Sequence, residues 1–438
     1  MREISLDELS KKRNEYYQNV KFTISRRALN KTKISDLTHV SEQYPKTRNY
    51  FSNTIKTMEA TNQMSSGRCW IFAGLNILRE KVAKRYNIQD FELSQNYVAF
   101  YDKLEKCNYF IESIIKLRSV NKFDRTFNLI LSNGITDGGQ WDMFVNIIKK
   151  YGVVPKDAFP ETYQSSNTKE IDAIINRYLR KTACIIRKGV NTDIDGIKAK
   201  AMQEIYEILC TAFGVPPEVI DFEYEDKDEN YHVYKNITPV DFLKDFVEFE
   251  YNDYVSIINA PTRDKPFNET YTVQYLGNVI EGKPIKYLNL ELKRFKELVV
   301  SQIVDGEVVW FGSDCSQYQD RTGGVWDDET FDENTLFQID DNMSKDEMLD
   351  YWESAMNHAM LLTGVNIEGG ITTKWKIENS WGRDHAFKGY HVATDSWFNK
   401  YVYQAVINKK YLTEEELELL KMEPNKLDLW DPMGTLAD

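Results

Sequence analysis

The sequence predicts an α+β fold, with helices in the N-terminal part of the chain and a sheet in the C-terminal third. Two patterns support this prediction. In the first 160 residues apolar side chains recur at intervals of three and four, as they do on one face of a helix. From about residue 253, short runs rich in β-branched and aromatic residues are separated by turn residues, which is typical of strands. The 438 residues suffice for two or three domains or for one elaborated core.

The helices are expected in the following order. Residues 1–50 predict one short amphipathic helix, carried by Ile4, Leu6 and Leu9, and then a polar connection. A segment rich in Ser and Gly leads into a helix that begins at Cys69, because Ile71, Leu75, Leu78 and Val82 follow it at helical spacing. A further helix is expected after residues 93–95, and another between the glycine turn at 136–141 and Tyr151-Gly152. Helical residues are expected again from 168, up to Pro216-Pro217 and the acidic run DFEYEDKDENY.

Strands are expected at seven later runs: YVSIINA, TYTVQYL, KYLNLEL, VVWFG, HAMLLTGV, TKWKIENS and HVATDSWF. Thr413 and Glu416 then fit a capping box for a helix over 414–422. Pro424 follows, and the last residues predict an extended tail.

Composition and charge exclude several classes of function. Hydrophobic residues make up 42% and charged residues 28% of the chain, and no stretch approaches the roughly 18 apolar residues that a membrane span needs. The net charge of −13 disfavours nucleic-acid binding. Residues 1–50 carry 11 Lys/Arg against 6 Asp/Glu, whereas residues 314–348 carry 2 against 11. These segments are either two solvated surfaces or the two sides of a subunit contact.

The five cysteines are odd in number and contain no Cys-x-x-Cys pair, which argues against a disulfide framework and against a structural zinc site. The N-terminus is charged throughout and lacks the apolar core of a secretory signal. We therefore expect a cytoplasmic protein, in which a free thiolate could persist.

Cys69 is the best candidate nucleophile in the chain. A helix N-terminus favours a thiolate through its dipole and its unpaired N–H groups. Gln63 lies six residues earlier, so that a turn at Gly67 could bring its amide N–H beside the Cys69 N–H, where an oxyanion would form. The other cysteines are expected to be small structural residues: Cys107, Cys184, Cys210 and Cys315.

A histidine and an asparagine could complete such a site. His358 begins an apolar run that resembles a strand, and Asn379 ends the next one. The Asn379 side chain could accept the His358 ring N–H and fix its tautomer, with Trp381 shielding the bond from water. The remaining histidines are given no role: His39, His232, His385 and His391.

Five ordered motifs and the chain end resemble the bleomycin hydrolase and aminopeptidase C branch of the papain-like cysteine peptidases: NQMSSGRCWIFA, LSQNY, TDGGQWDM, NHAMLLTGV, IENSWGRDHAFKGY and the ending WDPMGTLA. The resemblance runs from about residue 50 to the C-terminus. His358 follows Cys69 by 358 − 69 = 289 residues, whereas papain-like enzymes usually place this histidine about 130–150 residues after the cysteine. About 150 residues are therefore inserted.

The resemblance implies a two-lobed papain-like core, a helical lobe and a β-rich lobe, with large helical and barrel-forming insertions. Five segments are expected on this basis: an N-terminal arm (1–50), the helical lobe with the nucleophile (51–165), an inserted hook and barrel-forming region (166–300), the β-rich lobe with His and Asn (301–422), and a C-terminal arm that reaches the active-site cleft (423–438). It also implies a homohexameric ring whose active sites face an internal channel.

The resemblance further implies a broad-specificity aminopeptidase that acts on peptides without a metal or an organic cofactor. Cys69 would be the nucleophile and His358 the general acid and base, the two forming a thiolate–imidazolium pair. Asn379 would orient the ring, and Gln63 would line the oxyanion hole. An alternative is a hexameric cage that binds peptides or nucleic acid and retains only vestigial hydrolysis.

Substrate-binding residues follow from the same resemblance. Gly138 and Gly139 match glycines whose backbone pairs with a bound peptide, although a plain turn is the alternative. Asn357 could present its carbonyl to the substrate backbone. Ala437 and Asp438 would end the arm that blocks the cleft and would offer a carboxylate to the substrate's amino group. Because Asp438 extends the chain by one residue beyond relatives that end at Ala, either it is removed or the cleft is shorter.

Overall fold

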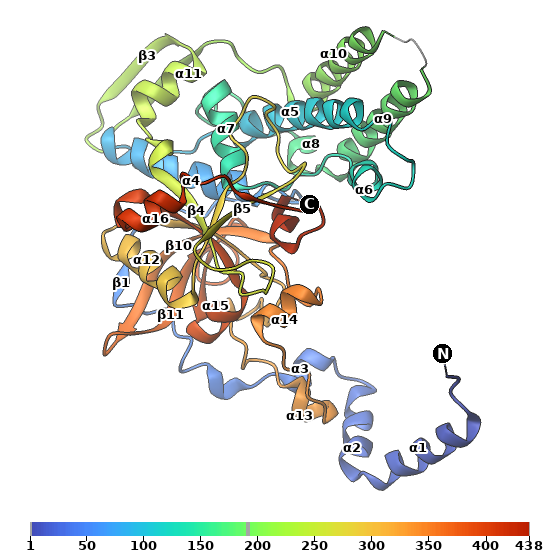
Figure 1. Cartoon of the computed structure of the whole chain (residues 1–438). Helices are drawn as coiled ribbons and strands as arrows, with labels where there is room; N and C mark the ends of the chain where they lie inside the picture. Colours follow the sequence, from blue (N-terminus) through green and yellow to red (C-terminus); the bar gives the residue numbers. More distant parts are fainter. Residues whose placement is uncertain (1, 190–192, 438) are drawn as a thin grey trace.

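The computed structural model describes residues 2–189 and 193–437. The helices are α1 Leu6–Gln18, α2 Val20–Leu29, α3 Ile34–Thr38, α4 Cys69–Arg85, α5 Gln95–Lys116, α6 Arg125–Asn133, α7 Trp141–Tyr151, α8 Tyr163–Ser166, α9 Lys169–Lys188, α10 Ile194–Phe213, α11 Pro239–Asp241, α12 Leu292–Val304, α13 Glu333–Phe337, α14 Lys345–Asp350, α15 Asp395–Tyr401 and α16 Glu414–Leu419. Helices α5–α10 gather on one side of the molecule, and α1 and α2 stand away from its body (Figure 1).

The strands are β1 Asn53–Thr54, β2 Ile220–Glu225, β3 Tyr231–Ile237, β4 Tyr254–Ile258, β5 Glu269–Val273, β6 Tyr287–Asn289, β7 Val309–Ser313, β8 Gln319–Asp320, β9 Val325–Trp326, β10 His358–Glu368, β11 Ile371–Glu378, β12 Tyr390–Thr394, β13 Val402–Asn408 and β14 Asn425–Leu427. Twelve of them form one mixed sheet in the order β14-β5-β6-β4-β13-β7-β10-β11-β12-β9-β8, with β1 paired to β10. The sheet takes strands from both sides of residue 300, and β2 and β3 form a separate hairpin.

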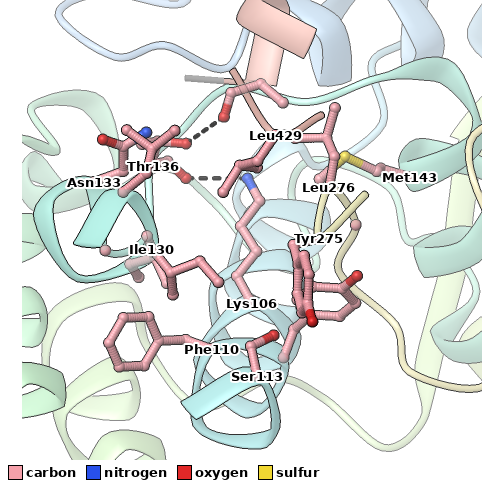
Figure 2. A pocket seen from close by; sticks show the side chains of 16 residues that line it. Lys106, Phe110, Ser113, Ile130, Asn133, Thr136, Met143, Tyr275, Leu276 and Leu429 are labelled. Atoms are coloured by element: carbon pink, nitrogen blue, oxygen red, sulfur yellow. Dashed lines mark hydrogen bonds between the residues drawn. The ribbon is translucent and has the colours of Figure 1, made fainter. Parts of the chain in front are cut away.

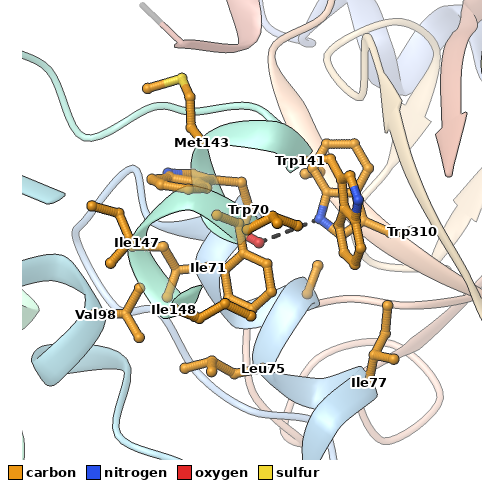
Figure 3. Packing of buried hydrophobic residues seen from close by; sticks show 14 of the residues in the cluster. Trp70, Ile71, Leu75, Ile77, Val98, Trp141, Met143, Ile147, Ile148 and Trp310 are labelled. Atoms are coloured by element: carbon orange, nitrogen blue, oxygen red, sulfur yellow. Dashed lines mark hydrogen bonds between the residues drawn. The ribbon is translucent and has the colours of Figure 1, made fainter. Parts of the chain in front are cut away.

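The helical part and the sheet share a buried core that lies directly behind the start of α4. Trp70, Trp141 and Trp310 are each at most 1% exposed, and the rings of Trp141 and Trp310 lie side by side with centroids 6.1 Å apart (Figure 3). Trp310 of β7 donates its indole N–H to the backbone oxygen of Trp70 at 3.3 Å. The position of α4 against the sheet is therefore determined by packing and by a hydrogen bond between the two parts.

Several local predictions are confirmed. Helix α4 begins at Cys69, α7 ends at Tyr151, and the capping box of Thr413 and Glu416 starts α16. The strand expected at HAMLLTGV is β10, and Asn379 directly follows β11. The helix expected over 414–422 ends earlier, at Leu419.

Other predictions were wrong. Residues 1–50 contain α1, α2 and α3 where one helix was expected, and exposed polar helices of this kind lack a strong apolar period. The acidic run after Pro217 forms most of β2 and the turn that leads into β3. In β2 the buried residues Ile220 and Phe222 alternate with exposed acidic residues. The run HVATDSWF divides into β12 and α15, whose start is capped by the Thr394 hydroxyl. Helices α6, α12, α13 and α14 were not expected, and the last residues, which were expected to be extended, form a 3-10 helix over Pro432–Ala437.

Within the described ranges, no helix combines the length and the apolar character that crossing a membrane requires.

Candidate active site

The Cys69 side chain lies at the contact between the two parts of the molecule. Cys69 is the first residue of α4 and is 4% exposed. Its sulfur accepts a hydrogen bond from the Ala359 N–H of β10 at 3.4 Å. Burial raises the pKa of the thiol to about 11, whereas the N–H groups of Ala359, Trp70 and Cys69 itself act in the opposite direction. These N–H groups would stabilise a thiolate once it formed.

His358 and Asn379 are brought together by the pairing of β10 with β11. The ring Nε2 of His358 lies 2.8 Å from Oδ1 of Asn379, and because an amide oxygen only accepts, Nε2 carries the proton. Nδ1 is then the ring nitrogen that can exchange a proton with a nucleophile. The Trp381 ring stacks on His358 with centroids 5.2 Å apart. Burial lowers the pKa of His358 to about 4, although the bond to Asn379 opposes this shift.

The two pKa shifts bear on the expected thiolate–imidazolium pair. Burial disfavours the charged form of Cys69 and of His358 alike, so neither ion forms readily without the other. The Cys69 sulfur is bonded to the residue that follows His358, which places both groups at the start of β10. Proton transfer between them would create both charges at once. The ion pair stays a prediction.

Gln63 is held beside this pair by one backbone and two side-chain hydrogen bonds. Its backbone N–H donates to the Ser380 oxygen at 2.8 Å, and its Oε1 accepts from the Ser380 hydroxyl at 2.6 Å. Its Nε2 donates to the Ser66 oxygen at 2.5 Å. Because an amide nitrogen has two hydrogens, one remains for an oxyanion. The role expected for Gln63 is compatible with this geometry and stays a prediction.

The glycine turn meets the C-terminal tail. The Gly139 N–H donates to the backbone oxygen of Leu436 at 3.1 Å, and the Gly138 oxygen accepts from Lys106 at 2.6 Å. A Cβ at Gly139 would lie 2.4 Å from the Trp70 ring, so this position requires glycine. A backbone group that was expected to pair with a peptide thus pairs with the chain's own tail.

Two further bonds fasten the tail across the contact between helices and sheet. The Thr435 hydroxyl donates to the Met356 oxygen at 2.7 Å, and the Thr136 hydroxyl donates to the Ala437 oxygen at 2.6 Å. Leu436 is 3% exposed and Ala437 is 7% exposed. The tail residue Asp438 lies outside the described residues.

Ala437 also forms part of the wall of a pocket of about 80 Å³ between α5, α6 and residues 275–277. Figure 2 shows Tyr275, Leu276 and Ile130 around it, with Lys106 and Thr136 at the side where the tail is bound. The end of the tail therefore borders a small space that is lined by both polar and apolar groups.

The Asn357 side chain holds the loop after β7 in place through two hydrogen bonds. Its Oδ1 accepts from the Cys315 N–H at 3.0 Å, and its Nδ2 donates to Asp314 at 2.5 Å. The side chain thus braces the loop after β7, and the role of the Asn357 carbonyl in substrate binding stays a prediction. One histidine without an assigned role, His391 of β12, packs against the rings of Trp326 and Trp381. Burial lowers the pKa of His391 to about 3.

A buried ion pair that sequence reasoning missed connects α4 to the end of β11. Arg79 donates to Glu378 at 3.1 Å, and Asn76 donates to the same oxygen at 2.9 Å. Glu378 directly precedes Asn379, so the pair ties the nucleophile helix to the orienting asparagine. The available signal was Arg79 itself, a charged residue directly after Leu78 in the apolar stretch of this helix.

Among the described residues, no three His, Cys, Asp or Glu side chains gather as a metal site would require. The arrangement instead presents a thiol at a helix N-terminus, an imidazole oriented by an amide, and a possible oxyanion donor. This combination is suited to nucleophilic attack on a carbonyl group.

Comparison with known proteins agrees with this chemistry. The family model of the peptidase C1-like family matches residues 3–434, and the chain belongs to this family. It is 44% identical to "Aminopeptidase C" of Listeria innocua, with 99% of both chains covered, and 40% identical to human "Bleomycin hydrolase", with 86% of both covered. The crystal structure of PepW from Lactobacillus rhamnosis HN001 matches with a TM-score of 0.96 at 43% identity, over 99% of both chains. The expected resemblance and the papain-like α+β fold are thereby confirmed.

Proposed function

We propose that Cys69, His358, Asn379 and Gln63 form the catalytic site with which this cysteine aminopeptidase removes residues from the free N-terminus of peptides. The observation that carries the assignment is the hydrogen bond from the Ala359 N–H to the Cys69 sulfur, which places the thiol at the start of β10. The ring of His358, the first residue of this strand, lies 2.8 Å from Asn379. The protein is a cysteine peptidase of the aminopeptidase type, similar to bleomycin hydrolase. Broad specificity for the residue removed is part of the proposal.

The proposed reaction has two halves. His358 takes the thiol proton while the Cys69 sulfur attacks the scissile carbonyl, and the resulting oxyanion is bound by the Gln63 amide and the Cys69 N–H. His358 then protonates the leaving amine, so that the C–N bond breaks and an acyl-enzyme remains. Water, deprotonated by His358, attacks the acyl-enzyme, and the proton returns to the Cys69 sulfur as the product leaves.

The tail supports the exopeptidase part of the proposal. Leu436 uses the Gly139 N–H and Ala437 uses the Thr136 hydroxyl, so a substrate cannot pair with these groups upstream of the scissile bond. A chain end placed there would offer its carboxylate to a protonated amine. Ala437 and Asp438 are therefore proposed as the substrate-binding end of the tail.

The test compares fluorogenic aminoacyl amides that have free or blocked amino groups. We expect turnover of the free amides, none of the blocked ones, and none by the Cys69→Ala variant, which removes the nucleophile but no large core group. Near-normal turnover by Cys69→Ala would refute the assignment of the nucleophile. Equal turnover of blocked and free amides would refute the exopeptidase assignment.

Assembly, location and segment boundaries are also proposals. We propose a homohexamer of the cytoplasm that acts on peptides and does not bind nucleic acid; the net charge of −13 supports the last point. The oppositely charged segments 1–50 and 314–348 contact each other within one chain, for example through Lys46 and Glu329 at 3.1 Å, so their charges do not argue for a subunit contact. The five segments with limits at 50, 165, 300 and 422 are retained as a functional division, although strands β4, β5 and β6 join the same sheet as the later ones. No observation favours a binding cage with vestigial hydrolysis.

A further inference from the structure

The loop from Gln63 to Cys69 is bound through hydrogen bonds and an ion pair to residues 161–168, the segment that directly precedes α9. The central contact is an ion pair: the Arg68 NH1 group lies 3.0 Å from each carboxylate oxygen of Glu161. The Arg68 side chain is 2% exposed and the Glu161 side chain is 22% exposed. The Ser165 hydroxyl donates to the same carboxylate at 2.5 Å. Because a buried guanidinium without a counterion is costly, Glu161 determines where Arg68 lies.

A chain of hydrogen bonds leads from Arg68 to the proposed oxyanion site. Arg68 Nε donates to the Ser66 hydroxyl at 2.9 Å, and this hydroxyl donates to the Gln63 backbone oxygen at 2.7 Å. The Gln63 amide in turn donates to the Ser66 backbone oxygen. Arg68 also immediately precedes Cys69. A displacement of Arg68 would therefore move both proposed oxyanion donors.

A second contact holds the same loop through Asp137. This carboxylate accepts from the Gly67 N–H at 2.8 Å and from Lys103 at 2.6 Å, and it also accepts from the Thr168 hydroxyl. The Lys103 side chain is 2% exposed and is shared with Asp172, in the first turn of α9. In addition, the Ser65 N–H donates to the Ser166 oxygen at 3.0 Å. The loop is thus held at Ser65, Gly67 and Arg68.

We infer that Arg68 and Glu161, supported by Asp137 and Thr168, are positioning residues for the oxyanion side of the reaction. This inference rests on the proposed role of Gln63 and Cys69. It means that the segment before α9 supports the nucleophile loop and does more than connect two helices. A role limited to stability is the alternative, and kinetics separate the two.

The experiment uses the full chain with Glu161→Gln, which removes the charge but keeps the size of the side chain. We expect kcat for a free aminoacyl amide to fall by about tenfold or more, with KM within about twofold, because transition-state contacts are misplaced while binding is not. Gln63→Ala combined with Glu161→Gln should lose clearly less kcat than the product of the two single losses, because the Gln63 amide is already absent and only the Cys69 N–H remains to be misplaced.

A control removes the carboxylate of another Arg–Glu pair, in which the Arg294 side chain is more exposed, at 31%. Arg294 contacts Glu416 at 2.7 and 2.8 Å, and neither residue contacts the 63–68 loop. Glu416→Gln should lower the melting temperature but leave kcat unchanged. If Glu161→Gln fails to fold, Ser165→Ala serves as a milder variant that releases the same carboxylate, and a smaller loss of kcat is expected.

Normal kcat in Glu161→Gln, or in Ser165→Ala when only this variant folds, would overturn the inference. The inference would also be overturned if the loss of kcat in the double variant equalled the product of the two single losses. An equal loss of kcat in Glu416→Gln would overturn it as well. These outcomes leave the proposed function intact, provided that activity disappears in Cys69→Ala. Activity that persists in Cys69→Ala would instead overturn the proposed function and this inference together.

Discussion

Replacing His358 by alanine tests how the Cys69 thiol loses its proton. Burial raises the pKa of this thiol to about 11, so without a nearby base only about one thiol in 10⁴ is ionised at pH 7. In the intact protein His358 can accept the proton, and a positioned general base contributes about 10²–10⁴ to such a step. We therefore expect His358→Ala to slow alkylation of Cys69 by iodoacetamide at pH 7 by about 10²–10⁴.

The two proteins should also differ in pH dependence. In His358→Ala the thiolate concentration rises about tenfold per pH unit below the raised pKa of Cys69, so alkylation should accelerate about 100-fold from pH 7 to pH 9. In the intact protein, burial lowers the pKa of His358 to about 4. The imidazole is therefore not protonated by the solvent at pH 6 and stays able to accept the Cys69 proton, so alkylation should persist there.

The assay is a timed reaction followed by peptide mass mapping, with the exposed Cys184 as an internal reference. Circular dichroism shows whether the variant is folded. Equal rates and equal pH profiles for Cys69 in the intact protein and in folded His358→Ala would show that His358 does not take the proton. Equal reactivity of all five cysteines at pH 6 in the intact protein would contradict the expected ion pair.

Three further outcomes are expected. Gln63→Ala should lower kcat by about 10²–10³, the usual loss for one oxyanion donor, and a loss of less than tenfold in steady-state kinetics would contradict its role. Deleting residues 435–438 frees the Gly139 N–H and the Thr136 hydroxyl, so the shortened protein should cut N-blocked peptides internally. An unchanged ratio of blocked to free cleavage would refute this expectation. Intact-mass measurement first establishes whether the full chain still carries Asp438. Light scattering at low ionic strength should give about six times the 51.3 kDa chain mass, and a monomer would argue against the hexamer.

Local patterns in the sequence were sufficient to place the main candidate residues on their elements. The start of α4 at Cys69, His358 at the start of β10 and Asn379 directly after the neighbouring strand β11 are confirmed. These features depend on the periodicity and turn residues of short segments, so they can be inferred without tertiary structure. The runs assigned to α12, α15 and the β2–β3 hairpin were not resolved in this way, because short apolar or charged stretches fit helix and strand alike.

The partners of charged residues were decided only by the tertiary structure. Arg68 meets Glu161, which lies 93 residues away, and Arg79 meets Glu378, which lies 299 residues away. The Gly139 N–H, which by itself could pair with a substrate, is taken by Leu436 from the chain's own end. The sequence by itself determined which side chains could do the chemistry, because each acts through its own functional group and its local backbone. Which groups support them depends on how distant segments pack, since one sequence contains many possible partners for each charge.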